Sequence, residues 1–302
     1  MSKPHHILHM ITPAKNLSPF DVNMAVDAGW TTVVPYTQIE ASEVTGLVQD
    51  AIFSRGRRGV RCTGMFIGGR DIDKAMDMLQ LAQSAMVPPF EISVFADPSG
   101  AFTTAAVLVA AVERQLQKVH DTGLAGQRVL VFGGTGPVGT TASVIAARAG
   151  AKVSIVGHKG DEHPRQVVSA CKERYNVDVE PVDGSSDTLK EQLLVDADVV
   201  FGTAKSGIQV LSADNLNAAT KLKVVGDLNA VLPLGIEGVG LTDDGRVIEG
   251  LNGAVGIGAL TVGNVKYQIQ QALLKDMIAA EKTQYLDFQY AFDRARDYVA
   301  QH

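Results

Sequence analysis

The sequence contains little cysteine, few basic clusters and no long apolar run, and each shortage excludes a class of protein. The two cysteines, Cys62 and Cys171, lie far apart and lack the spacing of a metal site, which excludes a disulfide scaffold and favours a reducing compartment. No apolar stretch approaches the roughly 20 residues that span a bilayer, and the N-terminal residues do not resemble a signal peptide. We therefore expect a cytoplasmic protein.

Positive charge is also scarce and scattered. Lys and Arg number 27 against 33 Asp and Glu, which gives a formal net charge of −6 at pH 7. The basic cluster at 55–58 (Arg-Gly-Arg-Arg) is interpreted as a solvated loop, with anion binding as the alternative. A nucleic-acid partner, which requires clustered Lys and Arg, is not expected. His5, His6 and His9 are joined by no carboxylate or cysteine, so no metal site is expected.

Apolar residues, in contrast, are abundant and fall in short runs. They make up 46% of the 302 residues, enough to build two domains. A first series of strand-like runs alternates with helical patterns, and its strands are expected at 7–11, 31–36, 64–67 and 92–96. A long apolar helix over 103–120 then precedes a glycine-rich break at 121–126. A second series follows, with strands expected at 128–132, 152–156, 177–182, 199–202 and 223–226.

This alternation is typical of parallel sheets covered by helices. We predict an α/β protein of two domains, each a largely parallel sheet flanked by helices. The first domain comprises residues 1–125 and is joined by the C-terminal segment 266–302. Two helices are expected in this last part of the chain, at about 265–281 and 287–300. The second comprises residues 126–265.

A glycine-rich loop follows the first predicted strand of the second domain. The pattern Gly134-x-Gly136-x-x-Gly139 comes after the apolar run 129–132 and leads into a helix of small residues. Such glycines allow a tight turn, close approach of the backbone to a pyrophosphate, and close packing of helix on sheet. The free N–H groups at the start of that helix favour phosphates. The sequence therefore predicts a Rossmann domain that binds a nicotinamide dinucleotide through Gly134, Thr135, Gly136, Pro137, Val138 and Gly139.

The end of the next predicted strand bears on the choice between NAD and NADP. NAD sites usually carry Asp or Glu there for the ribose 2′-hydroxyl. This chain has His158 and Lys159 instead, and Asp161 lies slightly too far along unless the loop brings it back. We predict that the two basic residues bind a 2′-phosphate, which favours NADP and leaves NAD as the second candidate. The alternative is that both are ordinary loop residues.

Two later strand ends should also border the dinucleotide, because ligands bind at the carboxyl ends of parallel strands. Thr203 and Ala204 follow one strand and are predicted to contact the cofactor. Asn229 follows the next strand and is predicted to bind the nicotinamide carboxamide or the substrate. The alternative is that Asp227 and Asn229 only form an Asx-turn.

Five separated segments, in order along the chain, carry a resemblance to a known family. They are 18–23 (Ser-Pro-Phe-Asp-Val-Asn), 66–69 (Phe-Ile-Gly-Gly), 97–104 (Asp-Pro-Ser-Gly-Ala-Phe-Thr-Thr), the glycine loop 133–139, and 253–260 (Gly-Ala-Val-Gly-Ile-Gly-Ala-Leu). Together they resemble methylene-tetrahydromethanopterin dehydrogenases of the methylotroph type. The similarity extends over nearly the whole chain, and the glycine loop with His158 and Lys159 looks more like the NADP-specific branch.

The resemblance implies oxidation of N5,N10-methylene-tetrahydromethanopterin to the methenyl form with NAD(P)+, in formaldehyde oxidation, by a homo-oligomer. Removing a hydride from a methylene carbon between two nitrogens leaves a delocalised amidinium cation. No proton moves, so the reaction needs no general base, and the sequence offers no strong nucleophile–base pair. Catalysis would depend on positioning and on charge stabilisation.

The resemblance also points to residues that would contact the pterin. Asp21 and Asp97 lie in the two most family-like segments and would supply negative charge, with helix capping as the alternative role of each. Phe20, Thr103 and Thr104 belong to the same segments and are assigned to substrate binding. For the two threonines, capping is again the alternative.

Lys266 is the third candidate catalytic residue, because a lysine in this region reaches the active site in related enzymes. Its alternative is a solvated lysine on a helix. Two other functions stay open: a methylene-tetrahydrofolate dehydrogenase, whose carrier presents the same reacting ring, and a non-catalytic NADP-sensing protein. Cyclohydrolase activity is not expected, because the Tyr-x-x-x-Lys motif of the bifunctional folate enzymes is replaced by Tyr36 and Glu40.

Overall fold

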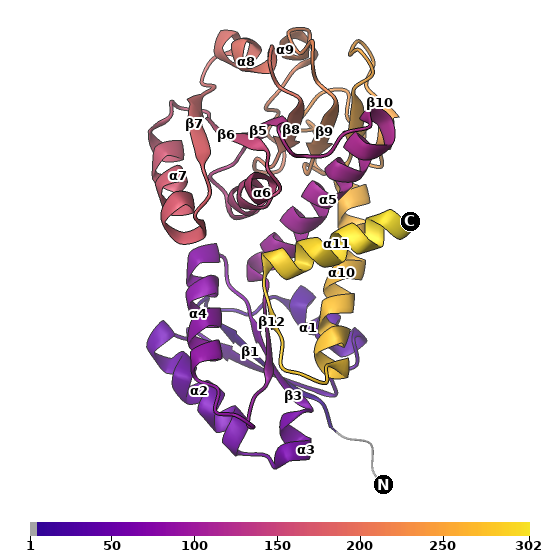
Figure 1. The fold of residues 1–302 in the computed structure, drawn as a ribbon. Helices are drawn as coiled ribbons and strands as arrows, with labels where there is room; N and C mark the ends of the chain where they lie inside the picture. Colours follow the sequence, from indigo (N-terminus) through magenta and orange to yellow (C-terminus); the bar gives the residue numbers. More distant parts are fainter. Residues whose placement is uncertain (1–4) are drawn as a thin grey trace. The chain divides into compact units, whose positions relative to one another are not determined.

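Two largely parallel sheets organise residues 5–302, the part of the protein that this computed structural model describes (Figure 1). The chain divides into two compact units. The first unit runs to Thr103 and also contains Tyr267–Ala291, and the second comprises Thr104–Lys266 and Phe292–His302. Each unit has a sheet flanked by helices, which confirms the predicted α/β class.

The sheet of the first unit is parallel throughout. Its order across the sheet is β12-β4-β3-β1-β2. Because every strand points the same way, the loops that follow β1, β3 and β4 all leave from one edge. The strands are β1 (Ile7–Thr12), β2 (Thr32–Thr37), β3 (Thr63–Ile67), β4 (Ser93–Ala96) and β12 (Tyr285–Leu286).

Local sequence signals set the starts of the helices in the first unit. Pro19 occupies the first turn of α1, where its missing N–H costs nothing. Glu40 and Glu43 form a capping box at the start of α2. The Asp71 carboxylate accepts two backbone N–H groups at the start of α4. The helices are α1 (Pro19–Asp27), α2 (Ala41–Phe53), α3 (Arg57–Val60) and α4 (Ile72–Ser84), with a 3-10 helix at Pro98–Gly100.

The two faces of the first sheet meet different helices, as the two-residue period of a strand requires. Gly64 of β3 lies under α10 (Ala259–Ala279) and the Trp30 indole. A Cβ at this glycine would come within 2.6 Å of the indole and 3.0 Å of Met277 on α10. The next residue, Met65, points to the other face and lines a cavity together with residues of α2.

The sheet of the second unit has the order β10-β11-β9-β8-β5-β6-β7. All its neighbours pair in parallel except β10, which is antiparallel to β11. The order reverses direction between β5 and β8, and dinucleotides bind at such a switch point. The strands are β5 (Arg128–Phe132), β6 (Lys152–Gly157), β7 (Val179–Asp183), β8 (Val199–Gly202), β9 (Val224–Asp227), β10 (Asp244–Val247) and β11 (Val255–Ile257).

Helices cover both faces of this second sheet. On one face, Leu108 of α5 approaches Gly226 of β9 so closely that a Cβ there would lie 2.5 Å from it. On the other face, Val225 joins a buried apolar cluster that includes Leu194 of α8 and Leu216 of α9. The remaining helices of the chain are α5 (Ala101–His120), α6 (Pro137–Arg148), α7 (Glu162–Tyr175), α8 (Asp187–Leu194), α9 (Ala213–Leu216) and α11 (Phe288–Gln301).

Two boundaries differ from the sequence prediction. The second unit begins within α5 at Thr104 rather than at residue 126, because α5 packs its apolar side chains onto β9. It also contains the end of α11, where Arg296 makes a bidentate ion pair with Glu113 of α5 at 2.6 and 2.8 Å. The glycine-rich stretch before residue 265 contains β11 and the first turns of α10, which begins at Ala259.

No helix in the described range 5–302 combines the length and the apolar character that crossing a membrane requires.

Candidate functional site

Loops from three strands of the first sheet meet at its carboxyl edge. The Ser99 hydroxyl, after β4, donates a hydrogen bond of 2.7 Å to the carbonyl of Gly69, after β3. A Cβ on Gly69 would lie 3.2 Å from the ring of Pro13, which follows β1. Asp21 and Asp97 belong to the segments that follow β1 and β4. The structure therefore places both predicted carboxylates in segments that leave this one edge.

Asp21 lies in the first turn of α1 and is only 3% exposed. Its Oδ1 accepts a hydrogen bond of 3.0 Å from Nε2 of Gln270, which is fully buried on α10. The next residue, Gln271, donates to the carbonyl of Met24 at 2.9 Å. Sequence reasoning missed Gln270. The available signal was its position four residues after Lys266, which places both side chains on one face of the helix.

Asp97 follows β4 directly and is fully buried. Its Oδ1 accepts the backbone N–H groups of Phe102 and Thr103 at 3.0 and 3.2 Å, and its Oδ2 accepts the Thr103 hydroxyl at 2.7 Å. Asp97 thus caps the first turn of α5. Ser99, between the strand and the helix, has a left-handed backbone with φ of 53°, which is uncommon for a residue other than glycine.

The other predicted substrate residues differ in exposure. Thr103 is buried and engaged with Asp97, whereas Thr104 is half-buried in the first turn of α5. Phe20, at the start of α1, is 46% exposed. Lys266 is half-buried on α10, one turn before Gln270. In the first unit, Asp21 and Asp97 are therefore buried, whereas the Phe20 ring is exposed.

The glycine loop of the second unit joins β5 to α6, as predicted. Gly133 has φ of +78°, and its carbonyl accepts the N–H of Gly136 at 3.0 Å, which closes a tight turn. Gly136 is the N-cap of α6, and Pro137 is the first helical residue. The Thr140 hydroxyl donates to the carbonyl of Gly134 at 2.9 Å. The first N–H groups of α6 therefore point out of the carboxyl end of β5.

The space around each glycine of this loop shows whether the protein itself would tolerate a side chain there. On Gly139 it would lie 2.5 Å from both the Gly133 carbonyl and the Thr203 hydroxyl, and on Gly134 it would lie 2.9 Å from Ile155. On Gly136 it would meet nothing closer than the Gly133 carbonyl at 3.4 Å. Protein packing thus explains Gly134 and Gly139 but leaves a cradle at Gly136, which fits the close approach of a pyrophosphate.

Thr203 and Ala204 lie against the same loop from the end of β8. The backbone N–H and the hydroxyl of Thr203 both donate to the Phe132 carbonyl, each at 2.8 Å. A Cβ on Gly133 would come within 2.4 Å of the Ala204 nitrogen. The glycine loop and the end of β8 are therefore in contact.

His158 and Lys159 are exposed and form the turn that follows β6. The turn is short, because His158 and Gly160 form a β-bridge across it and Gly160 has φ of +92°. Both basic side chains thus stand at the carboxyl end of the strand next to β5. This is the position at which Rossmann domains distinguish the two nicotinamide cofactors.

Asp227 ends β9 and is 2% exposed. Its carboxylate accepts the backbone N–H groups of Asn229 at 3.1 Å and of Ile236 at 3.0 Å. Burial raises the pKa of Asp227, and the hydrogen bonds from the backbone act in the opposite direction. The contact with Asn229 is the Asx-turn that the sequence offered as one alternative.

Asn229 ties the loop after β8 to the loop after β9. Its Oδ1 accepts the N–H groups of Gly207 and Val231, each at 3.0 Å, and its Nδ2 donates to the Pro233 carbonyl at 2.8 Å. Both lone pairs of the amide oxygen are therefore used. These contacts give Asn229 a role in holding the two loops, which the sequence pattern did not indicate.

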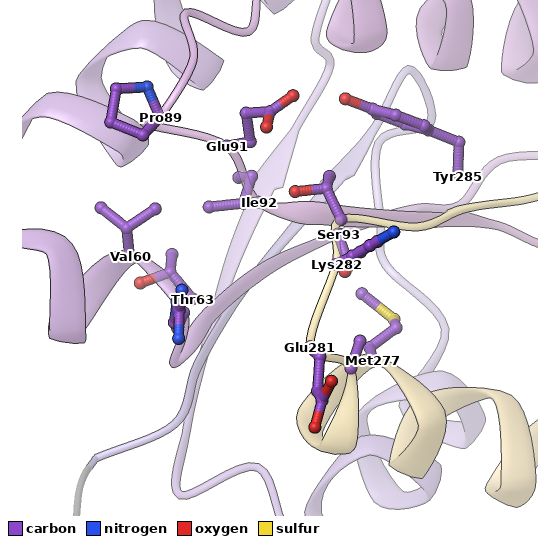
Figure 2. Close-up of a pocket in the computed structure, with 13 residues that line it drawn as sticks. Val60, Thr63, Pro89, Glu91, Ile92, Ser93, Met277, Glu281, Lys282 and Tyr285 are labelled. Carbon is purple, nitrogen blue, oxygen red and sulfur yellow. The ribbon is translucent and has the colours of Figure 1, made fainter.

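A cavity of about 390 Å³ opens at the opposite, amino-terminal edge of the first sheet. Thr63, Ser93 and Tyr285, the first residues of β3, β4 and β12, line it together with charged side chains. Figure 2 shows Glu91 and Tyr285 on one side of this space and Glu281 on the other. Burial and the charge of Glu91 raise the pKa of Tyr285. The predicted site residues within the described range do not line this cavity.

Comparison with known proteins agrees with the two-part arrangement. Residues 19–99 match the family model for the N-terminal part of methylene-tetrahydromethanopterin dehydrogenase. The chain is 46% identical over 290 residues to the NAD(P)-dependent methylenetetrahydromethanopterin dehydrogenase of Methylorubrum extorquens, across 96% of this chain and 97% of that protein. It is also 28% identical to the bifunctional protein MdtA of the same organism, across 88% of this chain and 89% of that protein.

Solved structures share the fold at much lower sequence identity. Shikimate 5-dehydrogenase from Listeria monocytogenes, solved in complex with shikimate and NAD, aligns with a TM-score of 0.52 and 16% identity. The alignment covers 97% of each chain. This likeness supports the Rossmann-type architecture of the chain.

Proposed function

The chain belongs to the family of NAD(P)-dependent methylenetetrahydromethanopterin dehydrogenases, and from this premise we propose the reaction that it performs. It is an oxidoreductase that transfers a hydride from N5,N10-methylene-tetrahydromethanopterin to NADP+ and yields methenyl-tetrahydromethanopterin, in one-carbon oxidation. The observation that carries the cofactor half of the proposal is the cradle at Gly136. A glycine without a packing reason at a helix N-terminus fits a bound pyrophosphate.

The reaction requires the protein to bind and align the two reactants and to stabilise a developing positive charge. One C–H bond of the methylene carbon breaks, and the hydrogen leaves with both electrons. The remaining positive charge spreads over the carbon and its two nitrogens, and no proton is released. When bound, NADP+ supplies the hydride acceptor at C4 of its nicotinamide. The protein must then hold the reacting groups in line and stabilise the developing cation.

On the cofactor side, we assign the pyrophosphate to the backbone from Gly134 to Gly139. Thr203 and Ala204 border it, because their contacts hold them against Gly133. We assign the 2′-phosphate to His158 and Lys159, whose exposed side chains offer hydrogen-bond donors, with the positive charge of Lys159, at the end of β6.

Asn229 stands at the end of β9, where the nicotinamide of a Rossmann domain lies. Its oxygen is engaged in holding two loops, so it would reach the carboxamide or the substrate through the second N–H of its amide.

On the substrate side, we assign the stabilisation of positive charge to Asp21. Its carboxylate is buried, which strengthens its electrostatic effect, and Gln270 fixes its orientation. Asp97 accepts three hydrogen bonds from the start of α5, so its contribution is to hold Thr103 and Thr104 in place for the pterin.

Phe20 and Lys266 complete the proposed substrate site. The exposed ring of Phe20 would offer an apolar face to the flat pterin. Lys266 is assigned to the active site from its place on α10, one turn before Gln270.

Side-by-side assays of nicotinamide reduction test the proposal. The purified protein is given NADP+ and either methylene-tetrahydromethanopterin or methylene-tetrahydrofolate, and the rise in reduced-nicotinamide absorbance is followed. We expect the faster reaction with the methanopterin carrier. A faster reaction with the folate carrier would contradict the substrate, and NADP binding without turnover of either carrier would indicate a sensing protein.

The compartment and the assembly are also proposals. We propose a cytoplasmic enzyme, supported by two free cysteines, of which Cys171 is buried. We propose a homo-oligomer from the family resemblance, and light scattering on the purified protein tests it. A monomeric mass at working concentration would contradict the assembly.

A further inference from the structure

The chain turns back on itself immediately after β6. A Cβ added to Gly157, the last residue of that strand, would lie 1.9 Å from the carbonyl oxygen of Gly160, so the turn presses its backbone against the strand end. Asp161 follows Gly160 directly and is the N-cap of α7. The short turn thus returns an acidic residue to the strand end, although in the sequence it lies four positions beyond it.

This acidic residue is paired with a cation. Arg165, four residues later on α7, forms a salt bridge with Asp161 through its guanidinium. The hydrogen bond and the charge of Arg165 lower the pKa of Asp161, so the carboxylate is ionised at neutral pH. Both side chains are accessible, at 35% for Asp161 and 64% for Arg165. A pair this exposed is weakly held and open to exchange with a ligand.

A carboxylate at the end of this strand has a known effect on nicotinamide binding. It accepts a hydrogen bond from the ribose 2′-hydroxyl of NAD, and it repels the dianionic 2′-phosphate of NADP. His158 and Lys159 have the opposite preference, because they attract the phosphate. The strand end therefore contains one residue that favours NAD beside two that favour NADP.

We propose that Arg165 sets the nucleotide preference of this enzyme by cancelling the charge of Asp161. This inference rests on the proposed binding of NADP at the end of β6. With Arg165 in place, the phosphate meets a neutral pair and the two basic residues of the turn. Asp161 still presents an oxygen to the hydroxyl of NAD, because a carboxylate has acceptor sites beyond those that one guanidinium uses. The same strand end then accepts both nucleotides and favours NADP.

Two single substitutions and the double variant separate the effects of Asp161 and Arg165 on nucleotide affinity. Arg165→Gln leaves the charge of Asp161 uncompensated, so NADP+ affinity should fall about tenfold while NAD+ affinity is kept or improves. Asp161→Asn removes the acceptor charge, so NAD+ affinity should fall and NADP+ affinity should not. The Asp161 side chain makes no capping hydrogen bond to the backbone of α7, so this change spares the helix. In the double variant, NADP+ affinity should return close to that of the unmodified protein.

Calorimetric titration with NADP+ and with NAD+, in the absence of any pterin, measures these affinities directly. Lys172→Gln is the matched control. Lys172 is exposed near the other end of α7 and pairs with Asp178, which follows the helix. It should leave the ratio of the two affinities unchanged. The inference is overturned if Arg165→Gln leaves that ratio unchanged. It is also overturned if the double variant binds NADP+ as weakly as Arg165→Gln alone, since Arg165 would then contact the phosphate itself.

This design keeps the inference apart from the proposed function. If the unmodified protein binds NADP+ and the Arg165 variant does not differ, only the role of Arg165 is lost. If the unmodified protein binds neither nucleotide, the proposed function is lost as well.

Discussion

Gln270 donates a hydrogen bond of 3.0 Å to the carboxylate of Asp21, across 249 positions of the sequence. Both side chains are buried, so the bond is shielded from water and holds the carboxylate in one orientation. Gln271 adds a second bond between the same two helices, to the carbonyl of Met24. The start of α1 is therefore fixed to α10 at the residue proposed to stabilise the substrate cation.

Asp21→Asn should lower kcat by about 100-fold, because it removes the negative charge that opposes the developing cation. NADP+ affinity, measured by calorimetry, should not change. Asp27→Asn, at the exposed end of the same helix, is the control and should retain full activity. Full kcat in the Asp21 variant would exclude this carboxylate from the electrostatics of the reaction.

Thr103→Val should lower the free energy of unfolding by about 1–3 kcal/mol, because it removes the hydrogen bond from the Thr103 hydroxyl to the buried carboxylate of Asp97. Urea unfolding followed by circular dichroism measures the change. Thr45→Val, at an exposed position of α2, makes the same chemical replacement and should change stability little. Equal effects of the two substitutions would refute the capping role of Asp97.

Gly136→Ala and Gly139→Ala should separate cofactor binding from folding. At Gly136 the protein leaves room for a Cβ, so alanine should fold normally but weaken NADP+ binding at least about tenfold by blocking the pyrophosphate. At Gly139 the Cβ would lie 2.5 Å from backbone and from Thr203, so alanine should destabilise the fold by about 1–3 kcal/mol. Thermal melts and calorimetry report the two effects. Normal NADP+ affinity in Gly136→Ala would remove the main support for the proposed cofactor site.

His9 should make the protein less stable in mild acid. Burial, and then the charge of Arg55, lower the pKa of His9 below its usual value of 6.5. The Tyr36 hydroxyl lies 3.1 Å from Nδ1 of His9. The folded state thus disfavours the protonated ring. The stability that neutral His9 contributes is fully present above pH 6.5 and is lost as the pH falls towards the folded-state pKa.

His9→Gln should flatten this loss, which urea unfolding at a series of pH values measures. The slope should be reduced rather than abolished, because burial and Arg55 lower the pKa of His6 as well. His163→Gln, on the exposed surface of α7, is the control. An unchanged slope in His9→Gln would assign the acid sensitivity to other groups.

Regular alternation made the architecture predictable from sequence. Short apolar runs of β-branched residues, such as those around Val129 and Val199, placed the strands from β1 to β9 within a few residues. The glycine loop was predictable because its glycines follow the spacing of the dinucleotide-binding pattern directly after an apolar strand. Three strands with weak periodic signals were missed: β10 and β11 are only 4 and 3 residues long, and β12 has 2. Such short strands depend on their neighbours for pairing rather than on their own pattern.

Features that depend on contacts between distant parts of the chain could not be predicted from the sequence. Nothing near Asn229 indicates that Gly207 and Pro233 would occupy its side chain, because those partners come from loops whose paths the tertiary structure sets. The sequence left Asp161 outside the strand end, since spacing alone does not reveal the tight turn at Gly160. The boundary between the two compact units falls at Thr104 within α5 for the same reason, since α5 packs on a strand more than a hundred residues away.

The glycine loop holds its shape through its own hydrogen bonds, from Gly136 to Gly133 and from Thr140 to Gly134. A nucleotide therefore meets N–H groups that are already oriented, and little binding free energy is lost in ordering the protein around the pyrophosphate. Association should be limited by encounter rather than by rearrangement of the loop. Differences in affinity between NADP and NAD should then appear mainly as differences in how slowly each nucleotide leaves.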